Sequence, residues 1–251
     1  MQPPLTSALV RLLRWSLLIV AGSSGLVASA EAGFFSRGAR SIEAVTFAVD
    51  PGKVYVPLNE AAKLLGWRVT QEGGDESVVV NEIAHSRSRF RQLVDGTVLV
   101  AIGDLERSGA TVVRDERKVP QEVGKGSKRF KVLIDAKRAE VNLEKQRLRG
   151  WQGDRLVLDC RVSSGRNGRT PAGNFKAGPY KAKMHYSKLY NNAKMPWSVQ
   201  INGNIFIHGF SSVPKYPASH GCIRVPLNEG NPAKFFYEWV DRGVPVRVVK
   251  G

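Results

Sequence analysis

Cysteine and histidine are scarce in this sequence of 251 residues, which contains two cysteines and four histidines. It has no Cys-x-x-Cys and no His-x-x-x-His, the spacings that most often hold zinc. Acidic residues are also in deficit, with 22 against 38 basic residues, yet no basic run is interleaved with aromatics as a base-stacking surface requires. The charge therefore favours a membrane surface or an anionic wall polymer as neighbour, and not nucleic acid.

Long hydrophobic runs are missing apart from one near the start. Arg11 and Arg14 precede the apolar stretch 15–27, and Ala28-Ser29-Ala30 follows it. This order is typical of a secretory signal peptide, whereas an uncleaved membrane anchor needs a longer run without the glycines and serines found here. No cysteine lies nearby to carry a lipid. We predict that residues 1–30 are a signal peptide, that the protein is exported to the periplasm or cell envelope, and that no stable membrane span remains.

The two cysteines lie in different surroundings. Cys160 belongs to an alternating strand pattern in which Leu156, Leu158 and Val162 share its face, so it is predicted to be a small core residue. Cys222 lies in a polar turn flanked by glycine. An exported chain invites a disulfide, but the different settings favour two free thiols with different roles.

The first part of the chain, residues 41–120, is predicted to be a small α+β domain. Alternation over 42–49 and 52–58 predicts strands, and the spacing over 59–66 predicts a helix that Gly66 ends. His85 stands alone there, as structural histidines usually do. The charged segment 114–129, which contains Pro and Gly, is predicted to separate this domain from the next.

Strand patterns dominate the second predicted domain, residues 128–250. Alternation continues from Phe130, and Asn202-Gly203 between two apolar runs predicts a hairpin. One helix is expected over 228–243 with Gly243 at its end, followed by a closing strand over 244–249. The fold class is therefore mainly β, with a small α+β domain in front.

The stretch "HGFSSVPKYPASHGCIRV" brings reactive side chains together. His220 lies two residues before Cys222, and His208 lies fourteen before it. A cysteine attacks as a thiolate and needs a base or positive charge nearby, which either histidine supplies. Gly209 and Gly221 permit tight backbone conformations after each histidine. A nucleophile site, a metal site and a structural His–Cys cluster all remain open from these residues alone.

Two further groups in this stretch fit acyl transfer. The N–H groups of Gly221 and Cys222 are candidates to stabilise an oxyanion, which is often the largest single contribution to such a reaction. Arg224 follows Cys222 by two residues and can favour the thiolate, hold a substrate carboxylate or form a structural salt bridge.

The same stretch resembles the active-site signature of the YkuD-type L,D-transpeptidases, with His-Gly, a variable loop, Ser-His-Gly-Cys and an Arg. The segments "VSSGRNGRTPAGNF", "MPWSVQINGNIFIHG" and "GVPVRVV" resemble other parts of that catalytic domain. The resemblance implies a β-sandwich-like domain that acts on peptidoglycan stem peptides without metal or cofactor. Cys222 would be the nucleophile, His208 the base, and His220 would orient the thiol or contact substrate. Ser219 would support the turn.

The resemblance also implies a reaction. Cys222 would form a thioester with release of D-Ala, and the amine of a second stem would resolve it. Resolution by water, giving a carboxypeptidase, or by a lipoprotein lysine stays open, as does a non-catalytic wall-binding module. The sequence does not give the oligomeric state. Residues expected to line the acyl-donor groove are Tyr190, Asn191, Met195 and Trp197.

In the first domain, "VPLNEAAKLLGWRVTQEGGDESVVV" resembles the small β-rich module found at the N-terminus of copper amine oxidases and in bacterial envelope proteins. This likeness implies a wall-associated adaptor and does not imply copper.

Overall fold

The computed structural model describes residues 40–72 and 76–251, so the predicted signal peptide lies outside the described residues. The described residues all belong to one compact unit. No helix in the described ranges has the length and apolar character needed to cross a membrane.

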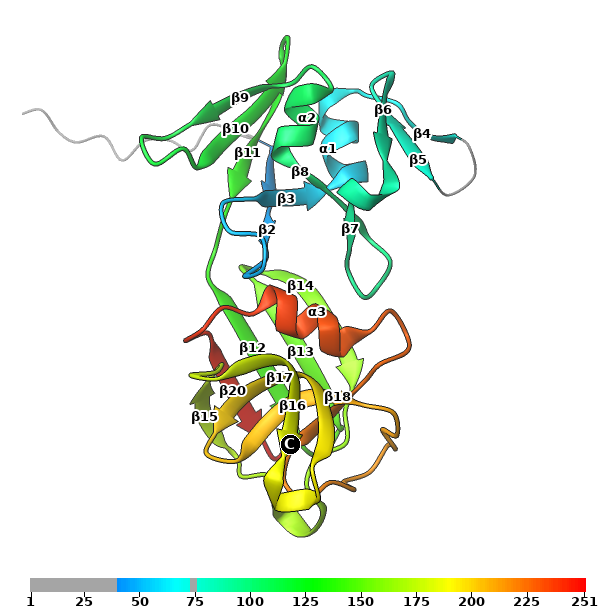
Figure 1. Cartoon of the computed structure of the whole chain (residues 1–251). Coiled ribbons are helices and arrows are strands. Elements are labelled where there is room, and N and C mark those ends of the chain that lie inside the picture. Colours follow the sequence, from blue (N-terminus) through cyan, green and yellow to red (C-terminus); the bar gives the residue numbers. More distant parts are fainter. Residues whose placement is uncertain (1–39, 73–75) are drawn as a thin grey trace, which may run out of the picture. The chain divides into compact units, whose positions relative to one another are not determined.

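The chain from residue 41 to 133 forms three small sheets with strand orders β1-β11-β10-β9, β2-β3-β8-β7 and β4-β5-β6 (Figure 1). Two short α-helices and one 3-10 turn accompany them. The elements are β1 (Ser41–Glu43), β2 (Val45–Thr46), β3 (Val54–Pro57), α1 (Leu58–Leu65), β4 (Val69–Glu72), β5 (Ser77–Val80), β6 (Ile83–Ser86), η1 (Arg87–Arg89), β7 (Arg91–Gln92), β8 (Val98–Ala101), α2 (Ile102–Arg107), β9 (Thr111–Arg114), β10 (Pro120–Lys125) and β11 (Lys128–Leu133).

Helix α1 confirms the helix predicted over 59–66, with a start one residue earlier. Its apolar residues recur on one face and are buried, among them Leu58, Ala61 and Leu65. They pack in a core that includes Phe130 of β11. Gly66 ends the helix in the left-handed conformation at φ 70°, which glycine adopts without a Cβ penalty.

Three other expectations for this part need correction. The strand expected over 42–49 is divided into β1 and β2, which belong to different sheets. The pattern of residues 94–104 suggests a hairpin, and the stretch does supply β8 of the β7–β8 pair, but it then continues into helix α2. The segment 114–129 contains β10, which pairs with β9 and β11, so it is a hairpin instead of a linker. The division into domains remains a prediction.

The chain from residue 137 onwards forms two larger sheets, with strand orders β14-β13-β12-β20-β15 and β16-β17-β18-β19. The predicted hairpin is confirmed as β17 and β18, but Asn202 belongs to β17 and pairs with Ile205, so the two-residue turn is Gly203-Asn204 instead of Asn202-Gly203. The closing strand is confirmed as β20. The elements are β12 (Lys137–Asn142), β13 (Arg147–Gln152), β14 (Arg155–Arg161), η2 (Arg166–Gly168), β15 (Gly173–Lys176), β16 (Lys181–Ser187), η3 (Lys188–Tyr190), β17 (Ala193–Asn202), β18 (Ile205–Phe210), β19 (Ile223–Pro226), α3 (Pro232–Trp239) and β20 (Pro245–Val249).

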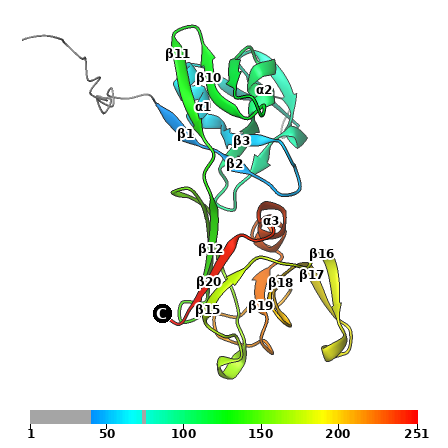
Figure 2. The same ribbon diagram turned by 90° about the vertical axis from the view of Figure 1, so that its left-hand side faces the viewer.

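Both sheets contribute to one hydrophobic core, which gives this part its sandwich-like character. Leu148 and Val246 come from the first sheet, and Ile207 and Ile223 from the second. Helix α3 packs against both sheets and buries Phe236 and Trp239 completely (Figure 2). Burial of side chains of this size stabilises the fold by roughly 1.5–3 kcal/mol each, so the core fixes the strands that carry the site.

Two details of this part differ from the sequence prediction. Cys160 is buried as predicted, but Leu156 is 43% exposed, because a bulge in the β13–β14 pair moves Val157 inward instead. The last helix is confined to α3, which Asn231 caps by accepting a hydrogen bond from the Lys234 N–H. It ends at Val240, before Gly243.

Candidate active site

The predicted nucleophile and base lie on neighbouring parallel strands. In the β18–β19 pair His208 is opposite Arg224, and Ile207 is opposite Ile223. Both isoleucines are buried in the core, so strand alternation places His208 and Arg224 on the other face. Cys222 directly precedes β19, and its Sγ contacts the carbonyl oxygen of Asn204 at 3.5 Å, just before β18. The tertiary fold therefore brings the two halves of the motif together.

The His208 imidazole is in the neutral protonation state that a general base requires. Its ring is 4% exposed, and Nδ1 donates a hydrogen bond to the Gly209 carbonyl oxygen at 2.9 Å. With the proton on Nδ1, the lone pair of a neutral ring lies on Nε2. Burial lowers the pKa of His208 to about 4, despite the bond to Gly209. The imidazole is therefore neutral at pH 7 and can accept a proton.

Cys222 is a thiol in the resting site. Burial raises its pKa above the ordinary value, while a backbone hydrogen bond from Phe206 and the charge of Arg224 oppose that rise. The other thiol, Cys160, is buried in β14 and its pKa is raised to about 12, so it is poorly suited to nucleophilic attack. Cys222 then needs a proton acceptor during the reaction, because no resting thiolate–imidazolium pair is favoured.

His220 is held differently from His208. It is exposed, and its Nε2 accepts a hydrogen bond from Nη2 of Arg166 at 2.9 Å. The Tyr190 ring stacks on the imidazole with centroids 4.7 Å apart. Partial desolvation and the charges of Arg166 and Arg169 keep the pKa of His220 below its usual value. With Nε2 engaged by Arg166, this ring is placed to orient neighbours or meet substrate.

The Ser219–Cys222 turn is closed by its own hydrogen bonds. Ser219 Oγ accepts from the Gly221 N–H at 3.0 Å and donates to the Cys222 carbonyl oxygen at 2.5 Å. Gly221 has φ 146°, which other residues rarely adopt, and a Cβ there would lie 3.0 Å from Cδ1 of Ile205. The Gly221 N–H, expected to face an oxyanion, is instead used inside the turn, which leaves the Cys222 N–H as the candidate donor.

A second segment supports this turn from residues 163–170. Ser163 pairs with Arg224, and Gly165 pairs with Ser219. Thr170 Oγ1 accepts from the Gly165 N–H at 2.7 Å and donates to the Gly221 carbonyl oxygen at 2.6 Å. The sequence of this segment shows only a resemblance to part of the L,D-transpeptidase catalytic domain, and no role for Thr170 or Arg166 is predicted from it.

Gly209 and Arg224 have different surroundings from those expected. A Cβ on Gly209 would clash with Leu227, so close packing and not a special φ requires glycine there. The Arg224 guanidinium lies 4.1 Å from the Phe210 ring centroid. It forms no ion pair within residues 40–72 and 76–251, which argues against the structural salt bridge.

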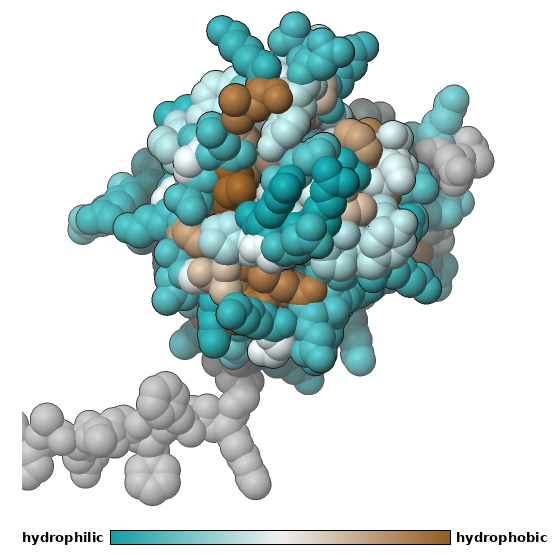
Figure 3. Space-filling view, turned by 90° about the horizontal axis from the view of Figure 1, so that it is seen from below, coloured by the Kyte–Doolittle hydropathy of each residue, from teal (hydrophilic) through white to brown (hydrophobic). Residues whose placement is uncertain are grey.

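Of the four residues expected to line the groove, Tyr190 contacts a predicted catalytic side chain, the His220 ring. Met195 is buried, and Trp197 packs against Tyr237 of α3. Asn191 ends η3 in the left-handed conformation. The face seen from below in Figure 3 is mostly hydrophilic, with several separate hydrophobic areas.

Fold and site together define a β-rich domain in which a buried neutral histidine on one strand and a half-buried cysteine at the start of the neighbouring strand are compatible with cysteine acyl transfer. The described residues contain no group of three or more His, Cys, Asp or Glu that could hold a metal ion.

The family comparison agrees with this class. Residues 136–248 match the model of YkuD, the L,D-transpeptidase catalytic domain. This part of the chain is therefore an L,D-transpeptidase catalytic domain, and the protein carries an enzyme domain. The match does not include residues 41–120, and the comparisons do not support the expected likeness to the copper amine oxidase module.

Solved structures overlap with parts of the chain. An L,D-transpeptidase from Stackebrandtia nassauensis is 25% identical, with 47% of this chain and 57% of that one covered and a TM-score of 0.42. One from Xylanimonas cellulosilytica is 30% identical, with 46% and 61% covered and a TM-score of 0.40. L,D-transpeptidase 1 of Mycobacterium tuberculosis is 16% identical, with 85% and 100% covered and a TM-score of 0.39.

The chain thus spans less than two thirds of the first two of these structures. All three TM-scores are below 0.5, so the family model, and not these overlaps, identifies the domain. The comparison with curated proteins gave no match.

Proposed function

We propose that the chain is an exported cysteine L,D-transpeptidase that cross-links peptidoglycan stem peptides through a thioester on Cys222. The observation that carries this proposal is the state of His208, which is buried and neutral, with Nδ1 bonded to the Gly209 carbonyl oxygen and Nε2 left as acceptor. The signal-like residues 1–30 and the net charge of +16 support export to an anionic wall.

In the first half-reaction, the Cys222 Sγ attacks the carbonyl carbon of the L-centre in an L,D peptide bond. The thiol proton passes to His208 Nε2 as the C–S bond forms. The Cys222 N–H stabilises the tetrahedral oxyanion. The C–N bond then breaks, His208 returns its proton to the leaving amine, and D-Ala departs from a thioester.

In the second half-reaction, the side-chain amine of another stem attacks the thioester carbonyl. His208 takes a proton from that amine and gives one to the leaving Cys222 sulfur, so the enzyme is regenerated. His220, which is hydrogen-bonded to Arg166 and stacked on Tyr190, positions the donor stem at the entrance of the site. Arg224, which has no ion-pair partner among the described residues, attracts a stem carboxylate.

Mass spectrometry of the mature protein incubated with disaccharide-tetrapeptide tests this function. A dimer that has lost one D-Ala is expected, and it should be absent with Cys222→Ala. The matched control is Cys160→Ala, which removes the other thiol and should still give the dimer. A tripeptide monomer alone would identify a carboxypeptidase, and full turnover by Cys222→Ala would refute the thioester.

A further inference from the structure

A basic cavity lies outside the catalytic site, mainly among β3, η1 and α2. Its volume is 780 Å³, within the range of ligand-binding pockets in proteins. Two residues of α3 complete the lining. Seven basic side chains line it against three acidic ones: Lys53, Arg89, Arg91, Arg107, Arg114, Lys118 and Lys234 against Asp50, Asp104 and Glu238.

The three carboxylates of the lining are already paired with arginines. Arg91 joins Asp50 at 2.7 Å and Glu238 at 2.8 Å. Asp104 is shared by Arg89 and Arg107. The cavity therefore keeps an excess of positive charge and offers no unpaired carboxylate to repel an anionic ligand.

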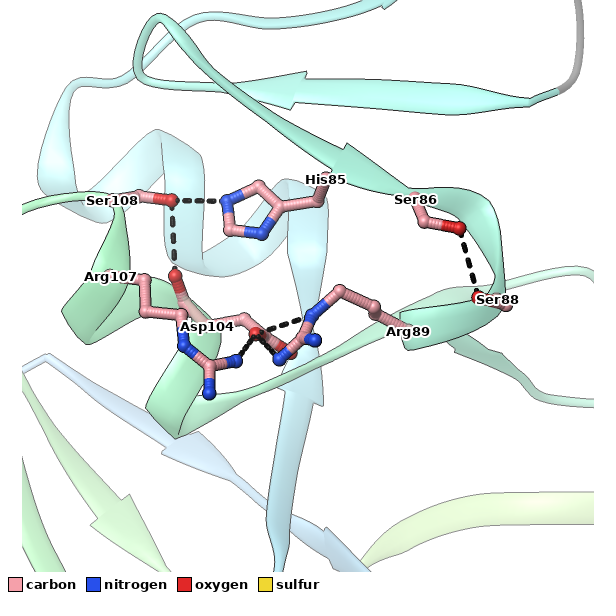
Figure 4. A network of polar contacts seen from close by, with 7 residues as sticks. All are labelled: His85, Ser86, Ser88, Arg89, Asp104, Arg107 and Ser108. Carbon is pink, nitrogen blue, oxygen red and sulfur yellow. Dashed lines mark hydrogen bonds and ion pairs between the residues drawn. The ribbon is translucent and has the colours of Figure 1, made fainter.

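Asp104 holds the two arginines in place (Figure 4). Its side chain is 6% exposed, and Oδ1 accepts from Arg89 Nε at 2.9 Å, Arg89 Nη2 at 2.6 Å and Arg107 Nη1 at 2.7 Å. The arginine side chains are 42% and 62% exposed, and most of their N–H groups lie outside these three bonds. Arginines that are already oriented lose less conformational entropy when they bind an anion.

Two buried side chains, Ser108 and His85, form a chain of hydrogen bonds that begins at the backbone carbonyl oxygen of Asp104 (Figure 4). Ser108 Oγ donates to the Asp104 carbonyl oxygen at 3.0 Å and is 2.7 Å from Nε2 of His85, which then donates to it. Burial lowers the pKa of His85, so this histidine stays neutral at pH 7. It fixes the end of α2 and adds no charge to the cavity.

We propose that this cavity binds the carboxylates of a peptidoglycan stem peptide other than the stem attacked by Cys222. The planar fork of arginine matches a carboxylate in two parallel hydrogen bonds, and the volume admits a peptide segment with more than one carboxylate. The residues around Asp104 thereby hold the enzyme on its polymer. The identity of the polymer rests on the proposed function, whereas the anion site stands on the cavity itself.

The test is the affinity of the Cys222→Ala protein for a fluorescent disaccharide-tripeptide, measured by anisotropy at low and physiological salt. Arg89→Gln/Arg107→Gln should weaken binding about tenfold or more, because both positively charged donors held by Asp104 are lost. Lys53→Gln/Lys118→Gln, which leaves Asp104 and its partners intact, should also weaken it. The matched control Arg87→Gln/Arg117→Gln removes the same charge outside the lining and should leave affinity unchanged.

Two further arms identify the ligand. The same fragment with its carboxylates converted to amides should lose the cavity-dependent binding, and an oligomer of glycerol phosphate should bind more weakly than the stem. The proposal would be overturned if Arg87→Gln/Arg117→Gln lost as much affinity as the cavity variants. It would also be overturned if the amidated fragment bound as well as the unmodified one, or if the phosphate oligomer bound more tightly than the stem. This assay measures binding and not turnover. If the fragment binds through the cavity but the enzyme forms no cross-link, the proposed function is refuted and the cavity proposal stands.

Discussion

The low pKa of His208 leads to a specific prediction for the pH dependence of kcat/KM. With a pKa of about 4, its imidazole is neutral and able to accept the Cys222 proton throughout the range from pH 5 to 8. A histidine of ordinary pKa would lose half of that capacity at pH 6.5. We therefore expect kcat/KM to stay flat as pH falls from 7 to about 5 and to decline only near pH 4.

The same shift links protonation to stability. Between pH 6.5 and 4 the unfolded chain binds a proton at this histidine that the folded protein does not, so the free energy of unfolding falls as pH falls through this window. A depression from 6.5 to about 4 corresponds to about 3 kcal/mol, lost in full below pH 4. His208→Gln should remove this pH dependence and lower kcat/KM by about 10²–10⁴-fold, as expected for loss of a general base.

The assay is cross-link formation followed by chromatography from pH 4 to 8, beside thermal unfolding at each pH. His220→Gln is the matched control. It removes an exposed imidazole bonded to Arg166, and the position of the acid limb should not move. A fall in kcat/KM centred near pH 6.5 would refute the assignment of His208 as base. So would a fall whose midpoint is shifted by His220→Gln and not by His208→Gln.

Three further predictions concern the turn. Gly221→Ala should lower the melting temperature and strongly reduce product, because an alanine is strained at φ 146° and its Cβ would press on Cδ1 of Ile205, at a cost of about 1–3 kcal/mol; normal stability with full activity would contradict this. Thr170→Val leaves two buried backbone groups unpaired and should cost about 1–3 kcal/mol in chemical denaturation. Arg166→Gln should raise the pKa of His220 in an NMR titration more than Arg169→Gln does, since Arg166 alone donates to that ring; equal shifts would count against it.

Several parts of the fold followed from local patterns. Helix α1 and its glycine end depend on apolar spacing and on one residue without a Cβ, and both are visible in a short stretch of sequence. The hairpin of β17 and β18 depends on an Asn-Gly turn signal between apolar runs, although the turn itself lies one residue later, at Gly203-Asn204. Helix α2 was missed because it has only six residues and follows directly on the apolar run of β8, too short a stretch to show a helical period of its own.

The sequence by itself determined the candidate nucleophile, its two histidines and the glycine-bounded turn, because these residues lie within fifteen positions of one another. Only the tertiary structure decided how they are used. Burial and the Gly209 carbonyl oxygen keep the His208 imidazole neutral with its proton on Nδ1, while Arg166, 54 residues away in the chain, engages Nε2 of His220. The same holds for the Asp104 network, where Arg89 lies 15 residues from its partner. Desolvation and hydrogen bonds between distant segments set these states, and no local pattern of residues encodes them.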